Sequence, residues 1–475
     1  MKRILVCGLL CSLLGGLAYG FELPGRRQTP LQAGVAVTDI TPPVGWRMSG
    51  YFNERPSTAV HDPLQAKALV LRQGKMALAL VLCDLIGISP ELADQVRQEA
   101  SLKTGIPYHF ILVAATHTHT GPLYHGALRD HLHAQAVAKH GKDPLEWVDY
   151  PGILADRLVE VIAQAYRDAE PVRLDVGGTQ VSGLSFNRRF HMRDGTVVFN
   201  PGKKNPDIVR PAGPVDTQLL GLMVTREEDK RALAAMACFP LHLDTIGGTA
   251  YSADYPLYLE RGLRRVTTTN LVVLFGNGAC GDINHINVSD ARPQGGFAEA
   301  ERIGATLAGA MIGAFSKFET IRKPALAARS RRISVPLQEC TPEQISQARE
   351  RLPLVGTDKL SFLDQVRAVK TMELQSFKSP DVTLEVQAFR LGPEAAIVGL
   401  PGEVFTELGT AIKQASPFKY TFVIELCNDV MNYIPTKKAF AEGSYETVNS
   451  LVKPGAGEQL VETALALLRE LQEKP

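Results

Sequence analysis

Cysteine is scarce in this sequence of 475 residues, and neither sign of charge is in excess. Two of the seven cysteines lie in the first twenty residues, and the other five are Cys83, Cys238, Cys280, Cys340 and Cys427. The spacing of these five fits neither a zinc ribbon nor a disulfide framework, and their odd number leaves at least one free thiol. Lysine and arginine number 51 against 50 acidic residues, for a net charge of +1. This balance predicts no nucleic-acid partner and no strongly acidic partner.

A membrane-spanning run is also lacking. The N-terminus has a charged pair, Lys2 and Arg3, then an apolar stretch, and then small residues up to Gly20, in the order of a secretory signal peptide. The apolar stretch is too short to stay as a membrane anchor. Neither Cys7 nor Cys11 follows the small residues of a lipoprotein signal. We therefore expect residues 1–20 to be a signal peptide and the mature protein to be secreted or periplasmic, with no transmembrane anchor.

The remaining chain has the composition of an ordinary globular protein. Its hydrophobic residues make up 45% and its charged residues 21% of the sequence. The length suits two or three average domains, although single α/β enzymes of this size also occur. Apolar strands alternate with amphipathic helices, for example a strand at 31–40, a hairpin at 64–82 and a helix at 152–169. This predicts an α/β fold with a mixed β-sheet core and covering helices.

The most informative stretch is 112–122, where an apolar run ends in Thr-His-Thr-His-Thr-Gly-Pro. A buried strand ends where glycine and proline remove its pairing. Alternation along an extended backbone puts His117 and His119 on one face, so both rings can point at one spot. The pair suits metal binding or acid/base work, and the alternative is two histidines that face solvent at a strand end.

Two later strands end in the same way. One delivers His242 to a loop with paired glycines, and another delivers Glu403 to the start of a helix. His242 is either a second ligand or a core histidine bonded to backbone. Glu403 is either a third ligand or a carboxylate that stabilises the helix N-terminus. Asp84, which follows a third strand, is similarly either a site residue or the cap of the helix that begins near Ser89.

Three further segments are ambiguous from local features. Arg188 and Arg189, between Phe186 and Phe190, form either a surface patch or an anion clamp. The glycine-rich turn at 276–285 is suited to cradle an oxyanion, although such turns are common without ligands. Residues 323–387 are more charged, and we interpret them as an inserted subdomain or a helical hairpin.

Taken together, these motifs resemble the N-terminal catalytic domain of the neutral/alkaline non-lysosomal ceramidases. The likeness extends from about Gly34 to Leu468. The matching segments are 116–122, Asn187-Arg188, 239–242, Gly281-Asp282, 400–403, 426–428 with Tyr433-Ile434, and Tyr445-Glu446. The resemblance implies a catalytic domain over 21–475 whose metal site is built from loops at strand ends, with no separate C-terminal domain.

The resemblance also implies the roles of individual residues. It places the ligands of one Zn²⁺ ion on His117, His242, Glu403 and Tyr433. It places neighbouring polar groups on His119, Arg188 and Tyr445, which would move a proton, orient the substrate and hold the developing oxyanion. Zinc bound in this way would activate a water molecule for hydrolysis of an amide or ester bond.

One departure separates this chain from the ceramidases. Where the family has a serine, this chain has Asn284, which cannot act as a nucleophile but can donate a hydrogen bond to a carbonyl. We therefore expect a zinc-dependent amidohydrolase that acts on a small-molecule N-acyl substrate, rather than a true ceramidase. This substrate is either a lipid, such as a sphingolipid-like molecule, or a smaller compound. The alternatives are a metal-binding protein without activity and a carbohydrate or lipid-headgroup pocket without metal.

Overall fold

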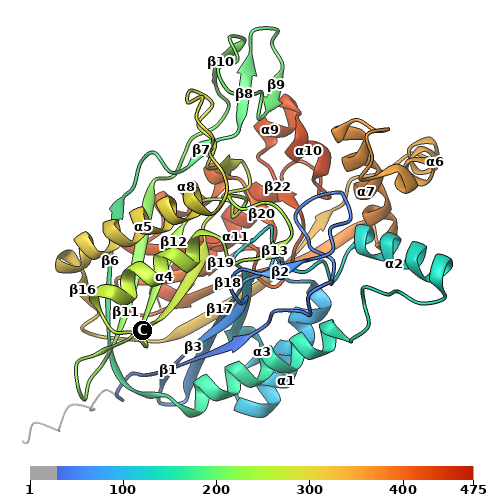
Figure 1. Cartoon of the computed structure of the whole chain (residues 1–475). Helices are drawn as coiled ribbons and strands as arrows, with labels where there is room; N and C mark the ends of the chain where they lie inside the picture. The colour runs from blue at the N-terminus through green and yellow to red at the C-terminus, as the bar shows by residue number, and fades with distance from the viewer. Residues whose placement is uncertain (1–28, 474–475) are drawn as a thin grey trace, which may run out of the picture.

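The computed structural model describes residues 29–473 (Figure 1). The proposed signal peptide, residues 1–20, lies outside the described residues. The described chain forms two packed β-sheets with helices on both outer faces, and so confirms the predicted α/β fold with a mixed sheet. Within residues 29–473, no helix combines the length and the apolar character that a membrane crossing requires.

The larger sheet has nine strands in the order β14-β12-β11-β6-β1-β3-β4-β5, with β16 also paired to β6. Their bounds are β1 Gln32–Asp39, β3 Gln65–Gln73, β4 Met76–Cys83, β5 Ile111–Ala115, β6 Glu170–Gln180, β11 Gln218–Arg226, β12 Ala232–Phe239, β14 Val272–Asn277 and β16 Glu319–Thr320. The pairs β4–β5 and β12–β14 are parallel, and the other pairs are antiparallel. The strand predicted at 31–40 and the hairpin predicted at 64–82 are confirmed as β1 and as β3 with β4.

The smaller sheet has four strands in the order β17-β18-β19-β21. Their bounds are β17 Ala327–Pro336, β18 Asp381–Arg390, β19 Ala395–Gly399 and β21 Tyr420–Ile424. Only β19 and β21 are parallel. Apolar side chains of both sheets, such as Leu80 and Leu222 with Phe389 and Phe422, form one buried layer between the sheets. Burial of apolar area on this scale is the main stabilising contribution to the fold.

Helices cover the two outer faces. The larger sheet packs against α1 Pro90–Thr104, α3 Tyr150–Arg167, α4 Tyr255–Val266 and α5 Phe297–Ala314, and the smaller sheet packs against α8 Thr406–Ala415 and α11 Ala456–Glu473. Each helix places an apolar stripe on the sheet, as Leu154, Leu158 and Ile162 of α3 do. The molecule therefore has four layers, helix, sheet, sheet and helix.

The segment 323–387 contributes two strands of the smaller sheet, β17 and β18. Between them lie α6 Pro342–Arg351 and α7 Phe362–Ser376, which pack on each other (Figure 1). The helical hairpin of the prediction is thus α6 with α7, whereas the flanking residues are part of a central sheet. Between β5 and α3 lies a further helix, α2 Ala127–His140.

Short elements complete the chain near the strand ends. The bounds of the strands are β2 Ala59–Val60, β7 Phe186–Asn187, β8 Arg189–Met192, β9 Val197–Phe199, β10 Ile208–Pro211, β13 Ala250–Tyr251, β15 Ile283–Asn284, β20 Glu403–Val404 and β22 Tyr433–Ile434. The helices are α9 Lys437–Glu442 and α10 Tyr445–Asn449, with 3-10 turns at Tyr108–Phe110, Phe315–Lys317 and Leu352–Leu354. Ligand sites in open α/β sheets form at the carboxyl ends of parallel strands. Here β5, β12, β14, β19 and β21 all lead into the segments described next.

Candidate metal centre

His117 lies two residues beyond the end of β5, in a tight turn. Its φ of +79° is in the left-handed region, which few residues other than glycine adopt. The predicted extended alternation of His117 and His119 is therefore wrong, because the strand ends at Ala115. The two rings nevertheless converge, with their Nε2 atoms 3.4 Å apart. A strained turn, rather than a strand, aims them at one place.

His242 lies three residues beyond β12 and faces His117. The two Nε2 atoms are 3.1 Å apart, and both residues are almost fully buried. The Nδ1 atom of His117 is 2.7 Å from the carbonyl oxygen of Ile86, and Nδ1 of His242 is 3.1 Å from that of Cys280. A carbonyl oxygen only accepts, so both rings carry their proton on Nδ1. Both Nε2 lone pairs therefore point at the shared space, as in metal-binding histidines.

Glu403 completes this group of three. Its Oε2 lies 3.3 Å from Nε2 of His117 and 3.2 Å from Nε2 of His242, and it has no hydrogen-bond partner among the described residues. The capping alternative fails, because α8 begins at Thr406 and no side chain caps it. Gly281 allows its backbone to lie close to β20, the strand that contains Glu403. A Cβ on residue 281 would be 2.4 Å from the carbonyl oxygen of Glu403.

The three donor atoms fit a zinc ion. Two imidazole lone pairs and a carboxylate oxygen repel one another at 3.1–3.3 Å unless a cation or a proton lies between them. Ligands about 2.0–2.1 Å from a tetrahedral zinc ion are themselves separated by about 3.3–3.4 Å. Burial, together with Arg188 and His117, lowers the pKa of His242 to about 3, so this ring stays neutral and able to bind a metal.

The pKa values of the other two donors, Glu403 and His117, reflect their contact with each other. Burial by itself would raise the pKa of the Glu403 carboxyl, but His117 and His242 hold it well below its usual range. Burial opposes protonation of His117, yet the Glu403 carboxylate outweighs it and raises the pKa of that ring. Negative charge on Glu403 is therefore retained at neutral pH, which favours a cation in this position.

Tyr433 and Tyr445 lie beside the three donors. In the short parallel pair of β20 and β22, Tyr433 is directly opposite Glu403. The two phenol oxygens are 3.4 Å apart. Burial raises the pKa of Tyr433 well above its usual value and that of Tyr445 to about 12. Both hydroxyls are therefore protonated at neutral pH and can donate hydrogen bonds.

Arg188 borders the same space, so the surface-patch alternative for this residue is wrong. Its Nη1 lies 3.1 Å from Nε2 of His242, and its Nη2 donates to the carbonyl oxygen of Gly281 at 2.7 Å. Its Nε pairs with Glu446 at 2.9 Å, and the same fully buried carboxylate pairs with Arg189 at 3.0 Å. Glu446 therefore fixes both guanidinium groups and neutralises part of their charge. Glu446 is one of the residues that carry the family resemblance, which assigned no role to it.

His119 is held on the opposite side by residues that the sequence did not single out. Its Nδ1 is 3.6 Å from Oδ1 of Asp244, which also accepts from the Tyr51 hydroxyl at 2.6 Å. The carbonyl oxygen of His119 accepts from Arg55 at 2.8 Å. Burial lowers the pKa of His119 to about 4, so the ring is neutral and available as a proton acceptor. Tyr51 and Arg55 lie in the segment between β1 and β2.

Asn284 lies nearby but turns its side chain elsewhere. It belongs to β15, which pairs with β7 just before Arg188. Its amide nitrogen donates to the side chain of Asn200 at 3.0 Å, and its amide oxygen accepts from the backbone of Ile286 at 3.0 Å. No hydrogen bond joins it to His117, His242 or Glu403 in the described part of the chain. Asp84 is likewise not a cap, since Ser89 caps α1 and Asp84 accepts from Gln65.

A second group of possible ligands, His133, Asp143 and Glu146, shares no residue with this centre. Asp143 pairs with Arg47 at 2.6 Å, and Glu146 pairs with Arg129. These guanidinium groups already neutralise the carboxylates, which argues against a cation there. By contrast, Glu403 forms no ion pair with a guanidinium group among the described residues, and its Oε2 has no hydrogen-bond partner there. His117, His242 and Glu403 are therefore the stronger candidate for a metal site.

Comparison with known proteins bears on the family resemblance and on the fold. Residues 31–254 match the family model described as neutral/alkaline non-lysosomal ceramidase, N-terminal, which confirms the resemblance seen in the sequence. Curated protein sequences give no match. A crystal structure of neutral ceramidase from Pseudomonas aeruginosa is similar, with a TM-score of 0.70 at 18% identity over 94% of this chain and 75% of that chain. A structure described as a ceramidase complexed with C2 has a TM-score of 0.71 at 18% identity over 94% and 76%. At this identity the two structures establish the shared fold.

Proposed function

We propose, on the premise that residues 31–254 belong to the neutral/alkaline non-lysosomal ceramidase family, that this protein is an exported zinc-dependent hydrolase of an N-acyl amide bond. The observation that carries the proposal is the convergence of two imidazole lone pairs and an unpartnered carboxylate oxygen at 3.1–3.3 Å. His117, His242, Glu403 and Tyr433 would hold the ion. The N-terminal sequence supports export.

When bound, the ion would lower the pKa of a water molecule to about 7 and would polarise the carbonyl group of the substrate, and amide hydrolysis requires both effects. The protein supplies the rest. Neutral His119, whose Nδ1 faces Asp244 at 3.6 Å, accepts a proton from the attacking water and returns it to the leaving amine. Tyr445 donates its hydroxyl to the developing oxyanion, and Arg188, fixed by Glu446, orients the carbonyl group.

This route needs no nucleophilic side chain. Asn284 cannot form an acyl intermediate, and its amide is already bonded to Asn200. Direct attack by water therefore fits this chain better than covalent catalysis does. For the same reason we propose an activity that is ceramidase-like, without true ceramide hydrolysis.

The substrate is expected to carry an apolar group. Phe199, Phe362 and Tyr445 pack together beside Arg188, with ring centroids 4.8 Å apart for Phe199 and Tyr445 and 5.1 Å for Phe362 and Tyr445. Phe52 extends the group to the surface, where Phe362 is 45% exposed. Partly exposed aromatic surface next to a polar site suits an acyl chain or ring.

The proposal is tested with N-acyl amines of graded chain length, assayed with and without a zinc chelator. We expect amine release that is lost on chelation and restored by added zinc. Zinc bound without any amine release from the series would favour the alternative, a metal-binding protein without catalytic activity. Release that survives complete zinc removal would contradict the proposal.

Removal of one hydroxyl gives a sharper test. Tyr445→Phe should lower kcat about a hundredfold while KM changes little, because the hydroxyl acts on charge that develops only in the transition state. The zinc content should stay unchanged. Tyr420→Phe is the matched control, because Tyr420 is the first residue of β21 and the site lies beyond the other end of that strand. Equal kcat in the Tyr445 variant and the wild type would exclude Tyr445 as an oxyanion donor.

A further inference from the structure

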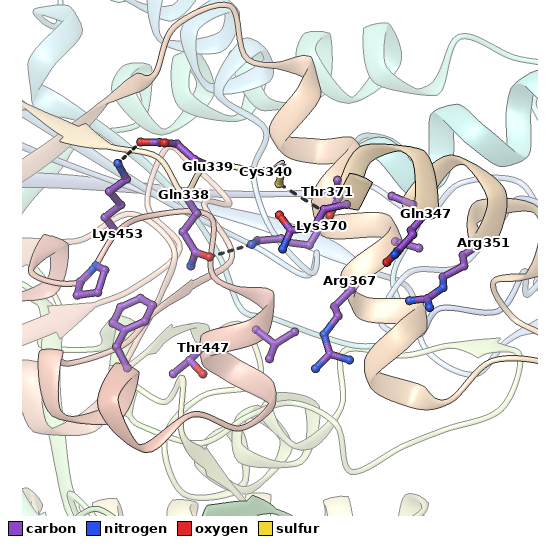
Figure 2. Close-up of a pocket in the computed structure, with 16 residues that line it drawn as sticks. Gln338, Glu339, Cys340, Gln347, Arg351, Arg367, Lys370, Thr371, Thr447 and Lys453 are labelled. Carbon is purple, nitrogen blue, oxygen red and sulfur yellow. Dashed lines mark hydrogen bonds and ion pairs between the residues drawn. The ribbon is translucent and has the colours of Figure 1, made fainter. Parts of the chain in front are cut away.

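A second cavity lies outside the metal centre, between the hairpin of α6 and α7 and the short helix α10 (Figure 2). Its volume is about 520 Å³, within the range of small-molecule sites. Residues from three separate parts of the chain line it, around 338–351, 367–371 and 440–454. None of the residues assigned to the metal centre is among its lining residues.

Positive charge dominates the walls. Four cationic side chains, Arg351, Arg367, Lys370 and Lys453, line the cavity against one carboxylate, that of Glu339. Glu339 pairs with Lys453 at the rim. Arg351 and Arg367 share a single carboxylate, that of Asp364, at 3.1 and 3.3 Å. The wall therefore carries more positive than negative charge, even after its ion pairs are counted.

Lys370 is the least compensated of these cations. Its Nζ donates to Oε1 of Gln338 at 2.8 Å, and no carboxylate lies within 4.0 Å of it in the described structure. Burial lowers the pKa of its ammonium group. A half-buried ammonium with only a neutral partner is costly unless an anion approaches it. Figure 2 shows Lys370 and Gln338 joined at the centre of the cavity, with Arg367 and Arg351 on the side of the helical hairpin.

The remaining walls are of two kinds. Gln347, Thr371 and Thr447 offer neutral polar groups, whereas Phe440 and Val448 are apolar. A bare inorganic anion would leave the apolar wall and much of the volume unused. The shape and chemistry therefore favour an oxyanion joined to a small apolar group.

We propose that this cavity binds a small organic phosphate, with the phosphate at Lys370 and Arg367 and the apolar part against Phe440 and Val448. The ligand is a soluble molecule with one phosphate monoester group. Its site is separate from the metal centre and does not depend on the proposed hydrolase activity. It is nevertheless close in the chain, because α10 carries Tyr445 of the centre and Thr447 of the cavity wall.

The test is titration calorimetry of the full mature chain with phenyl phosphate, which combines the two groups. We expect saturable binding to one site per chain, with weaker binding of inorganic phosphate and of phenol. Lys370→Met should weaken the binding about tenfold or more, through loss of a charge-assisted contact. The matched control Lys359→Met, at an exposed lysine before α7, should bind like the wild type.

Two further measurements keep the result unambiguous. His242→Ala should bind phenyl phosphate as the wild type does, which separates the cavity from the metal centre. Hydrogen exchange should show protection by phenyl phosphate in 338–371 and 440–454. Absence of saturable binding, equal binding by Lys370→Met, or protection confined to the segments of the metal centre would each overturn the proposal. Because Lys370→Met removes an uncompensated charge, its melting temperature should not fall, so lost binding will not reflect unfolding.

Discussion

Replacement of His242 with alanine is expected to remove both bound zinc and hydrolytic activity, with a fall in kcat/KM of more than about a thousandfold. His242 supplies one of the three converging donor atoms, 3.1 Å from Nε2 of His117 and 3.2 Å from Oε2 of Glu403. Without it, two protein donors of this group remain, and they do not hold a zinc ion firmly. Zinc is measured by mass spectrometry and activity by amine release from the best substrate of the series.

The control for this variant is His140→Ala, at an exposed residue that ends α2. It should keep both zinc and activity. Full activity in the His242 variant would contradict the assignment of His242 to the catalytic metal centre, whatever its zinc content. Activity lost with zinc retained would instead show that His242 acts on the substrate rather than on the metal.

Replacement of Glu446 with alanine is expected to destabilise the protein by about 3–5 kcal/mol, because it leaves Arg188 buried without its carboxylate partner and Arg189 with only the longer contact to Glu442, at 3.4 Å. Glu446 is fully buried and lies 2.9 Å from one guanidinium and 3.0 Å from the other. Urea denaturation followed by circular dichroism measures the free energy of unfolding.

The matched control is Glu470→Ala, whose carboxylate pairs with Arg331 at the surface. Its free energy of unfolding should change by about 0.5 kcal/mol or less. If the Glu446 variant were as stable as this control, the buried pairing would not be what fixes Arg188. In the absence of urea, where the Glu446 variant is folded, its hydrolytic activity should also be lower than that of the wild type, because Arg188 loses its fixed orientation.

The fold and the positions of the metal donors follow from features that are local in sequence. An apolar run with its closing turn predicts a strand end, and parallel strands bring their carboxyl ends to one edge. His117, His242 and Glu403 therefore converge although they lie 125 or more residues apart. Tyr433 and Tyr445 carry no such signal, and only the family resemblance indicated them.

The supporting contacts could not be predicted in this way. The pairing of Glu446 with Arg188 joins residues 258 positions apart, and nothing in either segment specifies the partner. Asp244 and Tyr51 were missed for the same reason. The turn at His117 was missed because tertiary contacts, such as its backbone bond to Leu85, hold a backbone conformation that local propensity disfavours.

The N-cap of α1 could not be predicted for a different reason. Asp84 and Ser89 are both good N-cap residues in front of the same helix, so local preference could not decide between them. The structure selects Ser89, whose hydroxyl accepts from the backbone of Leu92, while Asp84 bonds to the neighbouring strand.

The central claim is that two imidazoles, a carboxylate and a phenol from distant segments bind a single zinc ion. Its most direct test is the metal content of the wild-type protein, purified without chelator and dialysed against metal-free buffer. We predict about one tightly held zinc per chain. Protein that is folded by circular dichroism, holds no zinc after this treatment and takes up none when zinc is added would contradict it.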